Sequence, residues 1–227
     1  MTASRLAALQ GALAFTTLIG LLAVATAPAR ELVLHFAGYL ALASAVSAAA
    51  ARMLARGYAE ALARALAHVS RLGVAELGPR GATDATLVAQ SIAGLEQVAG
   101  LWPLAAAGAG VSGLLASILS YYIARRGAAA LLRLAKSLGA EPACRSPPGL
   151  SVAAVSSITL AGLGASAVIA SPSYGRLLRC IEEAGEELRR SLESRAAPAE
   201  AGEDAGAAAP GPVEPVDGEG KGAGEGL

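Results

Sequence analysis

The fold is decided by residues 32–73, which read LVLHFAGYLALASAVSAAAA (32–51) and then RMLARGYAEALARALAHVSRLG (52–73). Residues 32–51 contain no Asp, Glu, Lys or Arg, and about 20 apolar residues are enough for a helix to cross the hydrocarbon core of a bilayer. Nothing that breaks a helix follows Ala51. We therefore expect one helix of about 40 residues, roughly 60 Å long, that crosses a membrane over 32–51 and extends outside it to residue 72.

The second part of this helix is amphipathic. Polar residues recur every four positions, and apolar residues form the opposite stripe: Arg52, Arg56, Glu60, Arg64 and His68 against Leu54, Tyr58, Leu62, Leu66 and Val69. Glu60 is four residues from both Arg56 and Arg64, so we expect it to pair with them. The stripe fits a solvated helix with a core-facing side, or a surface that docks a partner or binds lipid.

Three further apolar blocks, residues 6–27, 98–124 and 150–170, are each long enough for one crossing. Trp102 and the pair Tyr121-Tyr122 suit the aromatic belts at the two membrane interfaces. The first block also resembles a signal peptide, but its length favours an uncleaved anchor. The sequence therefore predicts an all-α, polytopic integral membrane protein with about four transmembrane helices and cytoplasmic amphipathic helices, its transmembrane domain spanning residues 1–172.

The segments between and after these blocks are more polar. We expect residues 73–97 to form a mixed loop with a short helix capped by Thr83 or Asp84, and residues 125–149 to hold another short helix. Residues 173–195 predict a charged amphipathic helix in which Glu186 pairs with Arg190. Residues 196–227, rich in Gly, Pro, Ala and Glu, predict a disordered acidic tail.

The distribution of Lys and Arg favours a cytoplasmic N-terminus, because this orientation places most of the 18 basic residues inside. Four crossings then put the C-terminus in the cytoplasm as well, and we expect a prokaryotic cell membrane. This topology places Arg125 and Arg126 outside although they resemble a cytoplasmic helix end, so either that loop is external or one block does not cross. Cys144 and Cys180 are expected to be reduced thiols in opposite compartments, unable to pair.

Small residues in the third and fourth blocks predict close helix packing. Glycine, alanine and serine let two membrane helices approach, and the residues expected to do so are Gly108, Ser112, Gly113, Gly162 and Ser166. The spacing Gly108-x-Gly110-x-x-Gly113 also matches the dinucleotide-binding motif, but that motif needs a preceding strand. Helix packing is therefore the better interpretation.

His35 is the only ionisable residue within the four blocks, and it fits either an interfacial structural role or a proton or ligand role. No spacing of residues typical of a metal, cofactor or catalytic site occurs, so we expect no enzyme, no cofactor and no identifiable small-molecule ligand. The formal net charge of zero gives no basic field for nucleic acid.

Two functional classes fit these features. The first is a non-catalytic scaffold or accessory subunit of a membrane protein complex, whose partners are the lipid bilayer and itself or another membrane protein. The alternative is an oligomeric channel, pore or permease component that transports a solute, an ion or a macromolecule. The extended helix and the charged segment after residue 172 favour the first; the small residues of the later blocks favour the second.

Overall fold

The structure is a computed structural model that describes residues 30–70, 72, 74–107, 111–150 and 163–203, with isolated residues between Arg5 and Thr26. Regular structure in this part of the chain is helical, without strands, and consists of α2 (Arg30–Val69), α3 (Val74–Gly100), α4 (Trp102–Ala107), α5 (Val111–Ser137) and α7 (Leu163–Glu203). The predicted all-α class is confirmed. Met1–Glu193 form one compact unit and Ser194–Leu227 a second; the contacts below lie within the first.

Helix α2 is one uninterrupted helix of 40 residues. Alanine has the highest helix propensity, and the run of alanines before Arg52 joins the apolar and the amphipathic parts without a break. From Leu32 to Val69, α2 is the one helix among the described residues that is long and apolar enough to cross a membrane. Only 22% of its most apolar window is buried, whereas a helix in the core of a soluble protein would be mostly covered.

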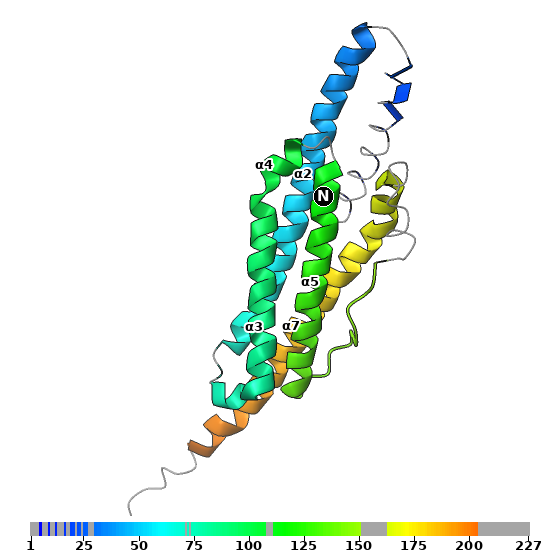
Figure 1. Ribbon diagram of the computed structural model, residues 1–227. Helices are drawn as coiled ribbons and strands as arrows, with labels where there is room; N and C mark the ends of the chain where they lie inside the picture. The colour runs from blue at the N-terminus through cyan, green and yellow to red at the C-terminus, as the bar shows by residue number, and fades with distance from the viewer. Residues whose placement is uncertain are drawn as a thin grey trace, which may run out of the picture. The chain divides into compact units, whose positions relative to one another are not determined.

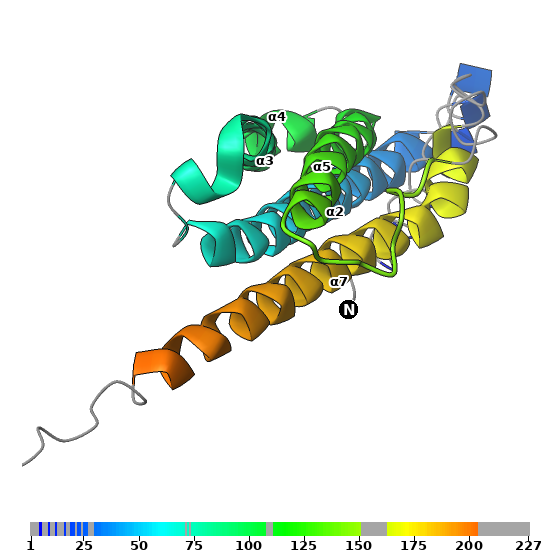
Figure 2. The ribbon, with the colours of Figure 1, turned by 90° about the horizontal axis from the view of Figure 1, so that it is seen from below.

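Helices α2, α3 and α5 lie side by side (Figures 1 and 2). Gly113 of α5 approaches Ser47 of α2, and Gly127 approaches Leu62, so these two helices run in the same direction. Helix α3 runs the opposite way, because Gly81 near its start lies against Leu134 of α5, and Gly94 farther along lies against Ile123. Gly127 also meets Ser91. Residues 91 and 127 therefore lie at one level of the bundle.

The single crossing helix predicted for residues 98–124 is wrong. This block contains the end of α3, all of α4 and the first half of α5, and α3 and α5 are antiparallel. The apolar block thus turns back on itself. The loop predicted for 73–97 is also mostly helical, as part of α3. Helix α5 continues through Arg125 and Arg126 to Ser137, so it absorbs the short helix expected after residue 124.

Glycine adopts a positive φ at two places, one where a helix is kinked and one where a helix ends. Within α3, Gly78 has φ 64° and ψ 171°, a left-handed conformation that marks a kink before Pro79. After α5, Gly139 has φ 72°. Its N–H donates to Lys136 O at 3.0 Å, and the N–H of Ala140 donates to Ala135 O at 2.9 Å. This pattern ends a helix and satisfies its last carbonyls.

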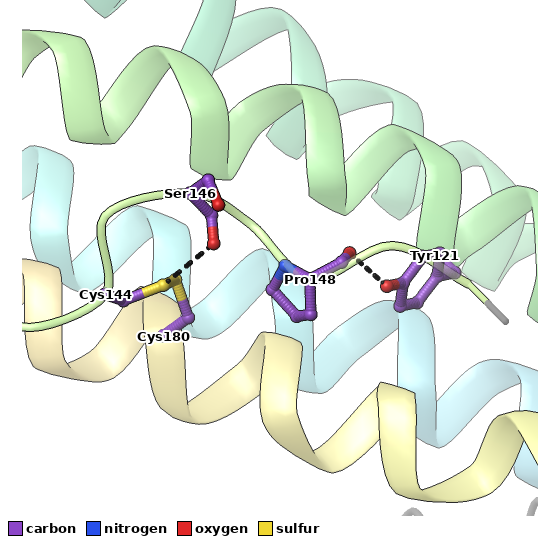
Figure 3. The surroundings of a disulfide bond; sticks show 5 residues. All are labelled: Tyr121, Cys144, Ser146, Pro148 and Cys180. Atoms are coloured by element: carbon purple, nitrogen blue, oxygen red, sulfur yellow. Dashed lines mark hydrogen bonds between the residues drawn. A yellow bond between two sulfur atoms is a disulfide. The ribbon is translucent and has the colours of Figure 1, made fainter.

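After α5, residues 138–150 run back along α5 and α7 (Figure 1). At the start of this return segment Leu138 O accepts a hydrogen bond from Ser191 Oγ at 3.1 Å. At its end the Tyr121 hydroxyl donates to Pro148 O. In between, a disulfide joins Cys144 to Cys180 of α7 (Figure 3), with their Cα atoms 5.4 Å apart.

The disulfide corrects the prediction that Cys144 and Cys180 are reduced and face opposite compartments. Two bonded cysteines lie on the same side of any membrane, so a single crossing by residues 150–170 between them is incompatible with this bond. The sequence failed here because the separation of 36 residues carries no signal for pairing. The two cysteines meet because the return segment runs back along α7 (Figure 1).

Helix α7 joins two elements that were predicted separately. It begins at Leu163, inside the fourth apolar block, passes through Pro172 and continues as the charged helix to Glu203. It packs along α2 in the same direction: Tyr58 donates to Tyr174 O at 3.0 Å, and Gly185 lies against Ala65. Disorder was predicted from residue 196 onward, but α7 extends to Glu203, so the prediction is wrong for residues 196–203. Residues 204–227 of the predicted tail fall outside the described residues.

Candidate functional site

The two ends of the bundle expose different kinds of side chain, apolar at one end and charged at the other. Among the described residues, every large hydrophobic side chain that is exposed lies between Leu9 and Met53 or between Leu101 and Tyr122. Leu34 is 76% exposed and Leu104 is 67% exposed. We call the part of the bundle formed by the start of α2, by α4 and by the start of α5 the apolar end.

The interior of the apolar end is small and polar. The buried residues contributed by α2 and α5 there include Ser44, Ser47, Ser117 and Ser120, together with alanines. Ser117 and Ser120 donate to the carbonyl groups one turn before them, at 3.0 Å and 2.7 Å. Apart from Leu114, which is fully buried, leucine lies outside and serine, alanine and glycine lie inside, as is typical of helices that pack within a bilayer.

The predicted packing residues lie partly in this interior. A Cβ atom at Gly113 would lie 2.8 Å from the Ser47 carbonyl oxygen, so α5 and α2 approach as closely as glycine permits. Ser112 Oγ donates to Ala105 O at 2.7 Å and ties α5 to α4. Gly108 and Gly162 fall outside the described residues, as does the side chain of Ser166, and their packing roles stay predictions.

His35, the weak intramembrane candidate, is exposed on the first half of α2. It lies more than four turns before Arg52 along the helix. Neither its structural nor its proton-binding role is tested by this position, and both stay predictions.

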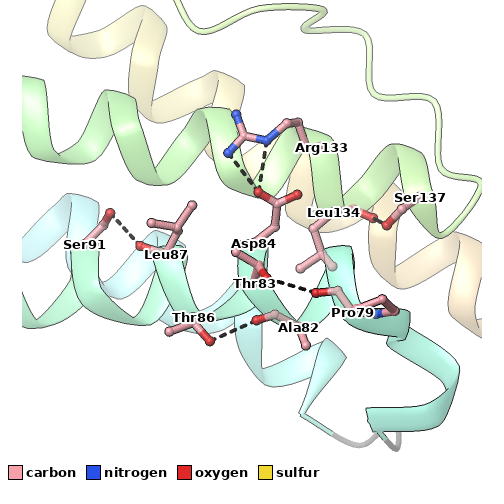
Figure 4. A network of polar contacts seen from close by, with 10 residues as sticks. All are labelled: Pro79, Ala82, Thr83, Asp84, Thr86, Leu87, Ser91, Arg133, Leu134 and Ser137. Carbon is pink, nitrogen blue, oxygen red and sulfur yellow. Dashed lines mark hydrogen bonds and ion pairs between the residues drawn. The ribbon is translucent and has the colours of Figure 1, made fainter.

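The other end of the bundle, which we call the charged end, resembles a water-soluble helix bundle. Its core consists of fully buried aliphatic side chains from α2, α3, α5 and α7, including Leu62, Leu95, Leu131, Leu134, Leu177, Ile181 and Leu188. Charged side chains cover it. Both Nε and an Nη atom of Arg133 on α5 bind Asp84 Oδ1 of α3, at 2.9 Å and 2.8 Å (Figure 4), so Asp84 joins two helices instead of capping one.

The ion pairs expected between Glu60 and the arginines of its own helix are not formed, and Arg64 pairs with a residue of another helix. Arg64 extends to Glu182 of α7 at 3.6 Å, and the carboxylate of Glu60 forms no ion pair within the part of the chain that the structure describes. The predicted pair between Glu186 and Arg190 is present at 3.5 Å. Sequence spacing finds partners on the same helix; it does not reveal a better partner on the neighbouring one.

The change from apolar to charged occurs within about two helical turns on four helices. Along α2, Arg52 is the first charged residue after Glu31; along α5 it is Arg125, and along α7 it is Arg176. On the antiparallel α3 the last is Glu96, which lines one cavity with Arg52. Arg125 and Arg176 both lie close enough to act electrostatically on the Tyr121 hydroxyl.

The residues at this level are predominantly arginine. Each of α2, α5 and α7 carries two within a single turn of the change, and we call this set the arginine belt: Arg52, Arg56, Arg125, Arg126, Arg176 and Arg179. Arginine next to an exposed apolar surface is typical of the cytoplasmic membrane interface. The sequence shows these arginines only as separate clusters, and the helix register brings them into one zone about two helical turns deep.

A cavity opens at the same level, between α2, α3 and the start of α4. Its volume is about 450 Å³. It is lined by charged and aromatic side chains together with alanines and Gly100; the former are Arg52, Arg56, Glu60, Glu96 and Trp102. The Arg52 guanidinium lies 5.6 Å from the centre of the Trp102 ring, within cation–π range. Its Nε is buried without a hydrogen-bond partner.

Sequence analysis missed this cavity. Arg52, Arg56 and Glu60 were recognised as one stripe, but Glu96 and Trp102 lie about 40 residues or more away in the chain. They reach the cavity only because α3 returns antiparallel to α2 and α4 follows at its end. The spacing of four between Arg52, Arg56 and Glu60 was the only signal that the sequence offered.

A cluster of tyrosines lies in the core at the level of the cavity, since Tyr58 lies between Arg56 and Glu60, which line the cavity. Tyr58, Tyr121 and Tyr174 are each 1% exposed or less, and the rings of Tyr121 and Tyr174 lie 5.5 Å apart. Burial, followed by the neighbouring Tyr121 and Tyr122, raises the pKa of Tyr174. Its hydroxyl is buried without a hydrogen-bond partner. The cluster fills the centre of the bundle and keeps its hydroxyl groups protonated.

Within the described residues, no three His, Cys, Asp or Glu side chains come together in a way that could hold a metal ion. No protein-family model, no curated protein and no solved structure matches this chain. The function is therefore inferred from the exposed side chains of the apolar and charged ends and from the residues at the boundary between them.

Proposed function

We propose that this protein is a membrane-anchored, non-catalytic scaffold or accessory subunit whose apolar end is inserted in a lipid bilayer and whose charged end projects into the cytoplasm. The observation that carries the proposal is that α2, α3, α5 and α7 change from apolar to charged within about two helical turns of one another. In a water-soluble protein nothing would align these changes, whereas a membrane surface does so directly.

In this arrangement, residues 32–51 of α2 cross the bilayer. The α3–α4–α5 turn enters and leaves from the charged side, so Arg125 and Arg126 share the cytoplasmic side with Arg52 and Arg56. The positive-inside rule favours that side for the arginine belt. A disulfide in the cytoplasm fits a heat-adapted prokaryote, because intracellular proteins of hyperthermophiles are rich in disulfides.

The charged end is the part that would meet a protein partner. It has a packed core of its own, and a groove between α2 and α7 is lined by charges of both signs, including Arg64, Glu182 and Arg189. Such a mixed surface favours a specific partner over general adsorption. The oligomeric pore has less support, because Gly113, one of the residues that suggested it, packs against Ser47 in the same chain.

Insertion can be measured with the sole tryptophan, Trp102, which is 46% exposed at the boundary. In vesicles whose acyl chains carry bromine at defined depths, we expect the strongest quenching from bromine near the headgroups. Equal and weak quenching at all depths would contradict insertion of the apolar end.

The partner can be sought with a photocrosslinking amino acid at Ala67, exposed on the charged part of α2. The matched site is Ala45, exposed on the apolar part of the same helix. We expect Ala67 to yield a defined adduct with a second polypeptide or a second copy in native membranes, and Ala45 to yield lipid adducts. Only monomer from Ala67 in intact membranes would refute the scaffold assignment.

A further inference from the structure

The charges in the boundary cavity are ordered by their distance from the apolar end. Along α2, Arg52 comes first, then Arg56, then Glu60, with about 6 Å of helix axis between successive residues. On the antiparallel α3, Gly100 and Ala99 come first and Glu96 follows. Both walls therefore place carboxylates farther from the apolar end than the first arginine.

These charges are not neutralised by one another. Among the described residues, the buried Nε of Arg52 has no hydrogen-bond partner, and the guanidinium makes only the cation–π contact with Trp102. None of Arg52, Arg56, Glu60 and Glu96 forms an ion pair within the described residues. Other acidic and basic side chains of the same bundle do, as Asp84 and Arg133 show. Burying an unpaired guanidinium nitrogen costs free energy, so the cavity is suited to a ligand that completes it.

The composition of the cavity restricts that ligand. A purely anionic group would be attracted by the two arginines but repelled by the two carboxylates. A purely cationic group would be attracted by the carboxylates but repelled by the arginines. A ligand with a phosphate and an ammonium group satisfies both pairs when its phosphate lies nearer the apolar end. Arginine binds phosphate oxygens well because its planar fork donates two hydrogen bonds at once.

We propose that this cavity binds the headgroup of a phospholipid with a primary ammonium group, of the phosphoethanolamine class. Its phosphate lies at Arg52 and Arg56, and its ammonium group lies at Glu60 and Glu96. The glycerol backbone passes Trp102, and the acyl chains continue along Leu101 and Leu104, which are 51% and 67% exposed. This inference rests on the proposed insertion of the apolar end, which brings headgroups to the level of Arg52.

The experiment uses the full-length protein in detergent micelles and follows the fluorescence of Trp102. The probes are short-chain phosphatidylethanolamine, phosphatidylcholine of the same chain length, soluble O-phosphoethanolamine and inorganic phosphate. We expect phosphatidylethanolamine to bind at least tenfold more tightly than phosphatidylcholine, whose methylated ammonium group cannot donate hydrogen bonds to Glu60 and Glu96. Equal binding of the two lipids would overturn the proposal. Equal binding of O-phosphoethanolamine and the lipid would overturn the lipid as the source.

Variants at both ends of the headgroup sharpen the test. Arg56→Gln should weaken binding of both lipids by tenfold or more, and Glu96→Gln should remove the preference for phosphatidylethanolamine while retaining binding. The matched controls, Arg80→Gln and Glu76→Gln, remove the same charges from exposed positions at the opposite end of α3 and should leave both affinities unchanged. Retained preference in Glu96→Gln would refute the assignment of the ammonium site.

Failure of this inference can be distinguished from failure of the proposed function. Flotation of the full chain with vesicles of phosphatidylcholine alone measures insertion and needs no ammonium site. Flotation without headgroup preference would overturn only the lipid site. A chain that did not float at all would overturn the proposed function as well.

Discussion

Replacing Leu42 by arginine distinguishes a helix exposed to lipid from a helix exposed to water. Leu42 is 56% exposed on α2, ten residues before Arg52. At 1.5 Å per residue this places it about 15 Å from the arginine belt, which is the middle of a hydrocarbon core about 30 Å thick.

The two environments predict different magnitudes. On a water-exposed surface a substitution of this kind changes stability by about 0.5 kcal/mol or less. At the centre of a bilayer, exchanging leucine for arginine costs about 3–4 kcal/mol on the insertion scale. That corresponds to a shift of roughly 300-fold in the insertion equilibrium.

The assay expresses the full-length chain and measures the fraction that stays in membranes after alkaline carbonate extraction. We expect Leu42→Arg to shift protein strongly toward the extracted fraction. Ala67→Arg, at an exposed position on the charged part of the same helix, is the control and should behave like the wild type. If the two variants extract alike, the assignment of residues 32–51 to lipid is refuted.

Three further changes test packing, covalent structure and burial. Gly113→Ala should destabilise the protein by about 1–3 kcal/mol in detergent unfolding, because the added Cβ meets the Ser47 backbone. The control, Gly57→Ala, has open space at its Cβ and should stabilise the protein by up to about 1 kcal/mol. Equal effects of the two substitutions would contradict the close approach of α5 to α2. Cys180→Ser should lower the free energy of unfolding by about 4 kcal/mol, because the disulfide closes a loop of 36 residues and restricts the unfolded chain. The substitution should also make unfolding insensitive to reductant. If unfolding of the wild type is already insensitive to reductant, the disulfide is absent. Tyr174→Phe should stabilise the protein by about 1 kcal/mol, because it removes a buried hydroxyl without a partner. Because burial raises the pKa of Tyr174 in the folded state, the wild type should lose stability as the pH rises above the ordinary tyrosine value of about 10, and unfolding scans across that range should show a shallower loss in the variant.

Much of the local structure could be predicted because it depends on neighbours in the chain. The run from Leu32 onward predicts a long helix that continues without a break past Ala51, and α2 has this form. The apolar length of residues 98–124 was misleading, because hydropathy counts residues and does not register that the chain reverses its direction between α3 and α5.

The candidate site could be predicted less well, because each of its parts depends on tertiary register. The cavity needs Glu96 and Trp102 to meet Arg52 across two helices, and the disulfide needs the return segment to bring Cys144 to α7. Arg125 and Arg126 did give a warning in the sequence, since they resembled a cytoplasmic helix end. The antiparallel α3–α5 turn explains why they lie beside the other arginines.

The continuity of α2 has a mechanical consequence. No glycine–proline hinge separates its apolar turns from its charged turns, so in the proposed arrangement the helix would act as a rigid spacer of about 25 Å from Arg52 to Val69. A molecule held at the far end of this spacer would stand at a set height above the bilayer. It would also tilt with the anchor, so that changes in membrane thickness would be transmitted as changes in its orientation.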